Sequence, residues 1–315
     1  MTKNQKAIFC MLLAGVLFSL TEVAMKKINA DLNGVQVNAT RYFLCGLFLM
    51  PWSRARLKAM DTHIHAAQMK LCALLAFSGI TIVGPLYQMA SVTLGAANTG
   101  VIFSSTPLFI IMLAALLLHT PVTRREGIAL AMQVLAIAIL VDPFHMTMDS
   151  VGVAALLLCV VCYSLYAVGG KKLITDLGSI TVTAWSFFWG GVQLLLVAGL
   201  SHIPAVAQWL MAHGFANYAC VPLFTGYTWE NLPWVLVLYI GITLVAFLSW
   251  FLAIEWGGVA LGSLTYFIKP ALSPVFALLF VGEPITTKML IGMVLMISGA
   301  FVALKRSKKS PGTSL

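Results

Sequence analysis

The chain has 315 residues, of which 60% are hydrophobic and only 9% are charged, and its mean hydropathy is +0.96. So little polar surface excludes an ordinary soluble globular domain and predicts an all-α integral membrane protein. The formal net charge of +9 would suit a nucleic-acid-binding protein. The basic residues, however, are distributed as membrane topology requires, so no nucleic-acid partner is expected.

Ten apolar stretches follow one another along the chain, and each is predicted to cross a bilayer as a helix of about 20 residues. Their continuous apolar runs lack the alternation that barrel strands show. In chain order, the predicted transmembrane helices are Ala7–Met25, Val35–Pro51, Leu71–Ala90, Ala96–Leu118, Gly127–Val141, Val151–Gly170, Ile180–Leu200, Trp234–Ile254, Gly258–Val281 and Thr286–Leu304.

The second half of the sequence repeats the first. Residues 18–32 match residues 163–177 at seven positions with a constant offset of 145, and a later segment recurs with an offset of 163. We therefore predict two five-helix repeats, residues 1–145 and 146–315, with an external loop insertion near residues 201–233. Two halves with an odd number of spans face opposite ways across the bilayer, and many transporters build alternating access on that arrangement.

Basic residues gather on one side of the predicted helices. With the N-terminus in the cytoplasm, Lys26, Lys27 and Lys288 lie outside, whereas fourteen basic residues lie inside. This bias predicts a multi-pass protein of the cytoplasmic (inner) membrane with both termini in the cytoplasm, and anionic lipid as the partner of the charge. The fourteen are Lys3, Lys6, Arg54, Arg56, Lys58, Lys70, Arg124, Arg125, Lys171, Lys172, Lys305, Arg306, Lys308 and Lys309.

One motif recurs in both halves: aromatic-x-x-Ala closes a span, Gly-x-Ala follows, and a Pro inside the next span precedes a loop Pro. The residues are Tyr87, Ala90, Gly95, Ala97, Pro107 and Pro121, then Trp250, Ala253, Gly258, Ala260, Pro270 and Pro284. With Gly-Glu-Pro at 282–284 and the glycine-containing helix after it, the pattern resembles the EamA-type transporters of the drug/metabolite transporter superfamily. The sequence departs from that family at 119–121, where His-Thr-Pro replaces a frequent Gly-Glu pair. The resemblance implies transport of small metabolites, amino acids or amphipathic compounds, often outward, through a cavity between the halves.

Three ionisable side chains, Glu22, Arg41 and Lys269, lie within predicted spans, where a charge costs about 2.5–3.5 kcal/mol on insertion scales. Lys269 lies midway along its span and shares a helix face with Thr265, Tyr266 and Ser273. We expect these four side chains to bind substrate, with Lys269 meeting a carboxylate or phosphate. The alternative is a structural ion pair that never touches the substrate.

Three prolines are candidate hinges. Pro270 and Pro274 follow Lys269, and Pro107 occupies the matching place in the first half. A proline lacks the amide hydrogen and crowds the carbonyl four residues earlier, so we expect open carbonyl acceptors, including that of Phe103, near a midplane transport site. The alternative is that the prolines only curve the helices.

Glu22 and Arg41 are candidates for coupling or for an ion pair. Glu22 is placed to pair with Lys26 one turn later or with Arg41 on the next span. Alternatively, its carboxylate takes up and releases a proton as the site opens to each side of the membrane. For Arg41 the interpretations are an ion pair, an anchor at the membrane surface and a substrate ligand.

Aromatic and amide side chains complete the predicted substrate-binding set: Tyr87, Gln88, Asn98, Tyr163 and Trp185. Aromatic rings stack on organic substrates, although helix packing and interfacial belts are the alternative for each residue. The inserted loop carries six aromatic residues. We expect it to lie on the outer leaflet or, alternatively, to cover the cavity as a lid.

Together these features predict a secondary transporter, in the outward direction that the resemblance implies, for an amino-acid-like or other carboxylate- or phosphate-bearing metabolite. Proton coupling is one option for its energy source. The alternatives are a channel or facilitator and a membrane-embedded lipid-modifying enzyme. The sequence shows no cluster of His, Asp and Glu at one membrane face, so we expect neither enzymatic catalysis nor a metal or cofactor.

Overall fold

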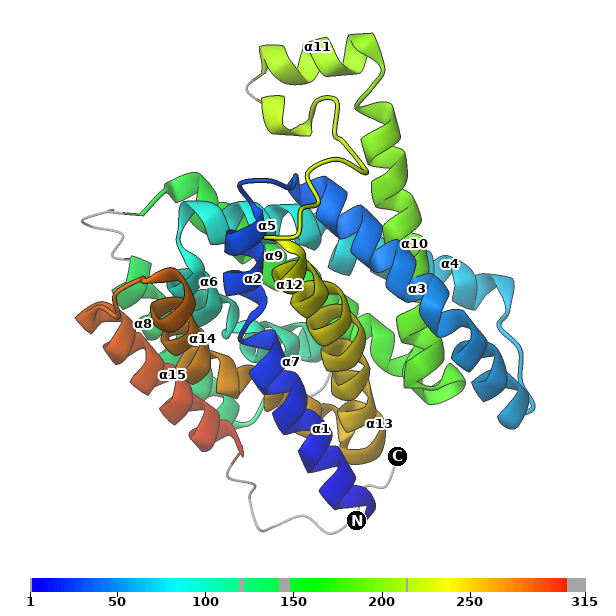
Figure 1. The fold of residues 1–315 in the computed structure, drawn as a ribbon. Coiled ribbons are helices and arrows are strands. Elements are labelled where there is room, and N and C mark those ends of the chain that lie inside the picture. Colours follow the sequence, from blue (N-terminus) through cyan, green and yellow to red (C-terminus); the bar gives the residue numbers. More distant parts are fainter. Residues whose placement is uncertain (1, 119–121, 142–147, 214, 305–315) are drawn as a thin grey trace.

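The computed structural model describes residues 2–118, 122–141, 148–213 and 215–304, and within these ranges all regular structure is helical (Figure 1). The His-Thr-Pro sequence at 119–121, where the chain departs from the EamA-type pattern, lies outside the described residues, as do the basic residues after Leu304.

The helices cover every predicted span. The first half contains α1 (Lys3–Phe18), α2 (Thr21–Ile28), α3 (Gly34–Ala59), α4 (Ala66–Ala76), the π-helical segment η1 (Phe77–Ile82), α5 (Val83–Thr93), α6 (Ala96–Phe103), α7 (Thr106–Leu118) and α8 (Arg124–Val141). The second half contains α9 (Ser150–Leu177), α10 (Ser179–Leu200), α11 (Pro204–Ala212), the 3₁₀ turn η2 (Ala216–Tyr218), α12 (Leu232–Leu236), the π-helical segment η3 (Val237–Ala246), α13 (Phe247–Ser263), α14 (Thr265–Val281) and α15 (Thr287–Leu304).

Within the described residues, six helical segments are long and apolar enough to cross a membrane. They are Lys3–Ile28, Ala66–Thr93, Ala96–Leu117, Ser150–Leu177, Ser179–Leu200 and Leu232–Gly258. Shorter apolar helices span Gly127–Val141, Ile268–Val281 and Thr287–Gly299. The predicted helical membrane protein is confirmed at this level, whereas the count of ten crossings stays a prediction.

Short turns interrupt two of the long segments at buried serines. Ser19 lies between α1 and α2, and Ser104 lies between α6 and α7. Their hydroxyls donate to carbonyl oxygens one turn back, with 2.7 Å from Ser19 Oγ to Gly15 O and 2.6 Å from Ser104 Oγ to Gly100 O. Such bonds compete with the helical hydrogen bonds of the backbone. Irregular backbone at membrane depth is tolerated only where protein encloses it, so both turns face the bundle interior.

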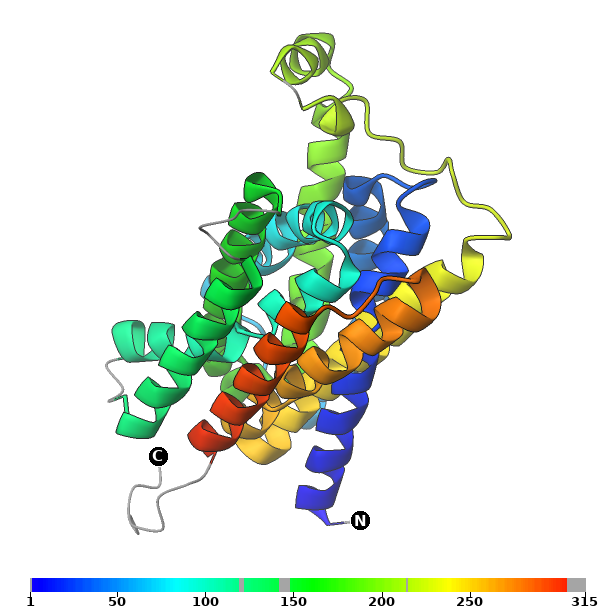
Figure 2. The same cartoon turned by 90° about the vertical axis from the view of Figure 1, so that its left-hand side faces the viewer.

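The interior of the bundle is an interface between the two halves. α3 packs along α10, α1 against α13, α5 against α9, α6 against α14 and α8 against α15 (Figures 1 and 2). A Cβ on Gly46 would lie 2.4 Å from Phe188 N, and one on Gly191 would lie 2.4 Å from Phe43 N. Only glycine permits this approach of α3 and α10, which is a common way to pack helices in lipid.

The inserted loop lies at the end of the bundle opposite the N-terminus, where α11 projects away from the other helices (Figure 1). It is tied to the α2–α3 connection, because Asn33 Nδ2 donates to Asn217 O at 2.6 Å and Asn231 Nδ2 donates to Asp31 Oδ2 at 2.9 Å. Its aromatic side chains include Trp229, which is 88% exposed. This exposure suits contact with lipid headgroups, and the two roles expected for the loop stay predictions.

Candidate functional site

Helices of both halves enclose a small cavity of about 50 Å³. Its wall is mostly aromatic and apolar but carries two cationic side chains. The lining residues are Phe18, Thr21, Met25, Arg41, Tyr42, Gly79, Val83, Gly84, Tyr87, Phe103, Tyr163, Ile242, Phe247, Tyr266 and Lys269. An apolar lining with a few convergent polar groups is typical of small-molecule sites, which are usually larger, at about 300–1,000 Å³.

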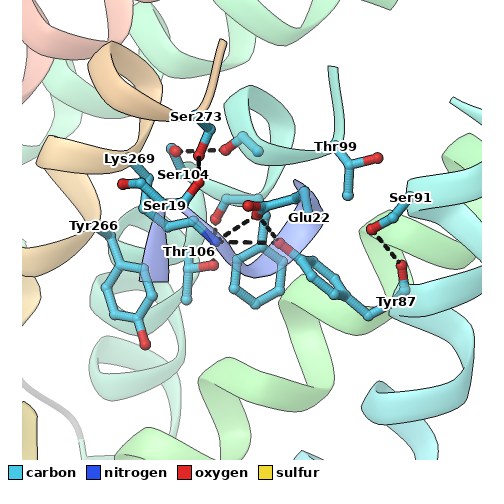
Figure 3. Close-up of polar contacts among 12 residues, drawn as sticks. Ser19, Glu22, Tyr87, Ser91, Thr99, Ser104, Thr106, Tyr266, Lys269 and Ser273 are labelled. Carbon is cyan, nitrogen blue, oxygen red and sulfur yellow. Dashed lines mark hydrogen bonds and ion pairs between the residues drawn. The ribbon is translucent and has the colours of Figure 1, made fainter. Parts of the chain in front are cut away.

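Lys269 and Glu22 form a buried ion pair beside this cavity (Figure 3). Lys269 Nζ lies 2.6 Å from Glu22 Oε1 and 3.1 Å from the hydroxyl oxygen of Tyr87, and that hydroxyl donates to the same carboxylate oxygen. The turn at Ser19 starts α2 so that Glu22 lies in its first turn, while α14 supplies Lys269 from the other half. The pair therefore joins the two halves at the cavity wall.

This ion pair is incompletely satisfied. The side chain of Glu22 is 0% exposed, and its Oε2 has no hydrogen-bond partner in the described part of the chain. Lys269 Nζ lies 5.0 Å from the centre of the Phe103 ring, within range of a cation–π contact. A buried ion pair gains little stability over the desolvation it requires, so its presence favours a functional reason for keeping it.

Arg41 contributes the second cation of the cavity. Its Nη2 donates to Asn38 Oδ1 at 2.7 Å and to the Tyr42 hydroxyl at 3.0 Å. Among the described residues, no carboxylate pairs with Arg41, and its Nε has no hydrogen-bond partner. Of the partners that the sequence offered for Glu22, the structure brings neither Arg41 nor Lys26 to it.

Several predicted residues meet at the cavity. Lys269, Tyr266, Tyr87, Tyr163 and Arg41 all line it. The Tyr266 hydroxyl donates to the Tyr163 hydroxyl oxygen at 2.8 Å, which leaves the hydroxyl hydrogen of Tyr163 to donate elsewhere.

Thr265 and Ser273 take part in helix–helix contacts instead. Thr265 Oγ1 donates to Met11 O at 3.4 Å, and Ser273 Oγ donates to Ser19 O at 3.3 Å. Both bonds connect α14 to α1 or to the turn that follows it. The predicted polar stripe on α14 is thus divided between the cavity and this helix interface.

Gln88, Asn98 and Trp185 do not line the cavity. Gln88 lines a separate pocket of about 420 Å³ beside the α2–α3 connection and the inserted loop. Asn98 Nδ2 donates to Leu94 O at 2.9 Å within its own segment. Trp185 packs edge-on against Phe188, with the ring centres 5.9 Å apart.

One of the predicted open carbonyls is partly occupied. Thr106 Oγ1 donates to Phe103 O at 2.5 Å, so a hydroxyl one residue before Pro107 uses one of the two lone pairs of that carbonyl. The role of this carbonyl at a transport site stays a prediction. Pro107 is the second residue of α7, directly after a turn, whereas α14 continues through Pro270 and Pro274.

Sequence reasoning missed a carboxylate bound at a helix start. Glu283 accepts hydrogen bonds from the amides of Ala96 and Ala97 at 3.0 and 2.9 Å and forms an ion pair with Lys26. Gly95, at φ 84°, turns these amides toward the carboxylate. Burial alone raises the pKa of Glu283, but the amides of Ala97 and Ala96 and the Lys26 ammonium hold it below its ordinary value. We call this group the Glu283 latch.

A second carboxylate repeats the arrangement at the start of α10. Glu255 accepts a hydrogen bond from the Ser179 amide at 3.0 Å and another from the Ser179 hydroxyl, and it pairs with Arg56 at 2.7 Å. We call this group the Glu255 latch. α3 starts beside the inserted loop and reaches Arg56 about 30 Å further along, so the two latches lie toward opposite ends of the bundle. The sequence contains little indication of either latch, because each one joins residues that are far apart in the chain.

No cluster of three or more His, Cys, Asp or Glu side chains suited to a metal ion occurs in the part of the chain that the structure describes.

Comparison with known proteins gives one consistent result. The chain matches the EamA-like transporter family twice, over residues 5–142 and over residues 150–305. An uncharacterized transporter of Clostridium kluyveri is 24% identical over 314 residues, covering 97% of this chain and 95% of that protein. Protein PecM of Dickeya dadantii is 26% identical over 284 residues, covering 84% and 87%. A solved crystal structure of a protein shares the fold, with a TM-score of 0.61 at 17% identity over 95% of this chain and 96% of that one.

Proposed function

The chain belongs to the EamA-like transporter family, and on that premise we propose that it moves a small organic anion across the cytoplasmic membrane by alternating access, in the outward direction. The observation that carries the proposal is the buried ion pair of Lys269 and Glu22 at the wall of a cavity between the halves. The latches of Glu283 and Glu255, toward opposite ends of the bundle, support a carrier rather than an open channel.

The pair suggests how an anion is loaded. A carboxylate or phosphate entering the cavity competes with Glu22 for Lys269, because both offer the ammonium an anionic oxygen. Once Lys269 changes partner, Glu22 is left as a buried carboxylate with one hydroxyl donor, and it is the group that we assign to proton coupling. Anion and proton then load together and leave the charge of the site unchanged. Net export is driven by the outward gradient of the cargo.

Transport in proteoliposomes tests this function, with a cargo first identified by a thermal-shift screen of a metabolite library. Lys269→Met should abolish transport, and Lys269→Arg should restore it only partly, because guanidinium differs in shape and donor geometry. Glu22→Gln should retain binding but lose the dependence on a pH gradient. The exposed Lys27 provides the control for loss of one positive charge, as Lys27→Met. Normal affinity and rate in a well-folded Lys269→Met would refute the proposal.

The orientation in the membrane is part of the proposal. Both termini are assigned to the cytoplasm, residues 201–233 to the outside, and residues 1–145 and 146–315 to two inverted repeats. The charge bias and the double family match support this assignment. So do two matching close contacts between the halves, Gly46 against Phe188 and Gly191 against Phe43.

A further inference from the structure

The cavity wall holds one cation, Arg41, that no carboxylate pairs with in the part of the chain that the structure describes. Arg41 is 3% exposed, its hydrogen bonds go to two neutral oxygens, those of Asn38 and Tyr42, and its guanidinium carbon lies 4.5 Å from the centre of the Tyr42 ring. Glu22, the carboxylate beside the cavity, is engaged by Lys269. A guanidinium does not give up its proton at any ordinary pH, so it cannot escape the cost of burial by becoming neutral.

The free donor of Arg41 belongs to the same wall. Arg41 lines the cavity, and its buried Nε lacks a partner among the described residues. An unpaired buried donor costs free energy until a ligand or water satisfies it. An anionic oxygen in the cavity would accept a hydrogen bond from Arg41 Nε and would also balance the positive charge of the guanidinium.

The remaining wall offers few free polar groups. The Tyr266 hydroxyl donates to Tyr163, the Tyr87 hydroxyl donates to Glu22, and the Tyr42 hydroxyl accepts from Arg41, so of these four hydroxyls only Tyr42 and Tyr163 keep a hydrogen to donate to a ligand. A sugar-like body with many hydroxyls would therefore leave its own groups unsatisfied. An aromatic or other apolar body would instead pack against these rings.

We infer that Arg41 is the residue that recognises the anionic group of the cargo, and that the cargo is a carboxylate carried on a compact aromatic or apolar body. This rests on the proposed transport function and narrows its substrate class. Because Glu22 already pairs with Lys269, Arg41 receives the carboxylate first, and its planar donors match the two carboxylate oxygens. Phosphate, with more oxygens to satisfy, fits this sparse donor set less well.

Equilibrium binding to the purified protein tests the inference with three probes that share a ring: phenylacetate, its neutral amide phenylacetamide, and phenyl phosphate. Wild type should bind phenylacetate about tenfold or more tightly than either of the others. Arg41→Gln should lose the preference for acid over amide, and Arg41→Lys should restore part of it. Lys27→Gln removes an exposed cation and serves as the matched control. A purely structural Arg41 would change stability without changing the ratio of the two affinities.

The outcomes separate this inference from the proposed function. If a folded Arg41→Gln or Arg41→Lys keeps the full acid preference while Lys269→Met loses it, Arg41 is not the recognition residue and the transporter proposal stands. Equal binding of phenylacetate and phenylacetamide by wild type overturns the assigned cargo class. Stronger binding of phenyl phosphate does the same and identifies phosphate as the anionic group.

Discussion

A double-mutant cycle on Glu22 and Lys269 should give a large coupling energy. In Lys269→Met, the fully buried carboxylate keeps only the Tyr87 hydroxyl, since its Oε2 already lacks a partner. Breaking a buried ion pair in this way costs about 3–5 kcal/mol, and we expect a loss of about 3 kcal/mol or more. In Glu22→Gln, the ammonium retains Tyr87 and the Phe103 ring, so a similar loss is expected.

The double variant Glu22→Gln/Lys269→Met should recover most of that stability. Replacing both charged side chains removes the cost of burying them together with the attraction between them. The free energy of unfolding of the double variant should therefore lie within about 1 kcal/mol of wild type. The coupling energy, which is the sum of the two single losses less the loss in the double variant, is then about 5 kcal/mol. Equilibrium unfolding by SDS in mixed micelles measures all four proteins under one condition. If the two single losses simply add in the double variant, the buried pair is not an interacting unit and the reasoning fails.

Two further predictions concern the Glu283 latch and the topology. Because the latch lowers the pKa of Glu283, its stabilisation is present above the usual carboxyl pKa and is lost as pH falls through the lowered one. Glu283→Gln should therefore cost about 1–2 kcal/mol at pH 7 and nothing at acid pH, and a difference independent of pH would contradict the latch. Single cysteines within residues 201–233 should react with impermeant reagents in intact cells, whereas labelling only in inverted vesicles would reverse the topology.

The pattern of apolar runs in the sequence was enough to predict a membrane protein and to pick out the few charged residues within its predicted spans. Continuous apolar runs report a lipid environment directly, because each span must satisfy its backbone internally and exclude charge from the bilayer. The same cost made Glu22, Arg41 and Lys269 conspicuous before any fold was known. Of the aromatic candidates, Tyr87 and Tyr163 line the cavity, whereas Trp185 does not, since composition cannot tell which face of a helix meets the interior.

Only the tertiary structure decided which charge meets which partner. Lys269 and Glu22 are 247 residues apart, and Glu283 reaches amides 187 and 186 residues earlier in the chain. Sequence spacing predicts contacts within a helix, where Glu22 and Lys26 are neighbours, but the packing of the two halves turns Lys26 toward Glu283 and Glu22 toward Lys269. The same packing places Arg41 against Asn38 and Tyr42, and no carboxylate among the described residues pairs with it. Pairing across a membrane bundle depends on helix rotation and crossing, which no local periodicity encodes.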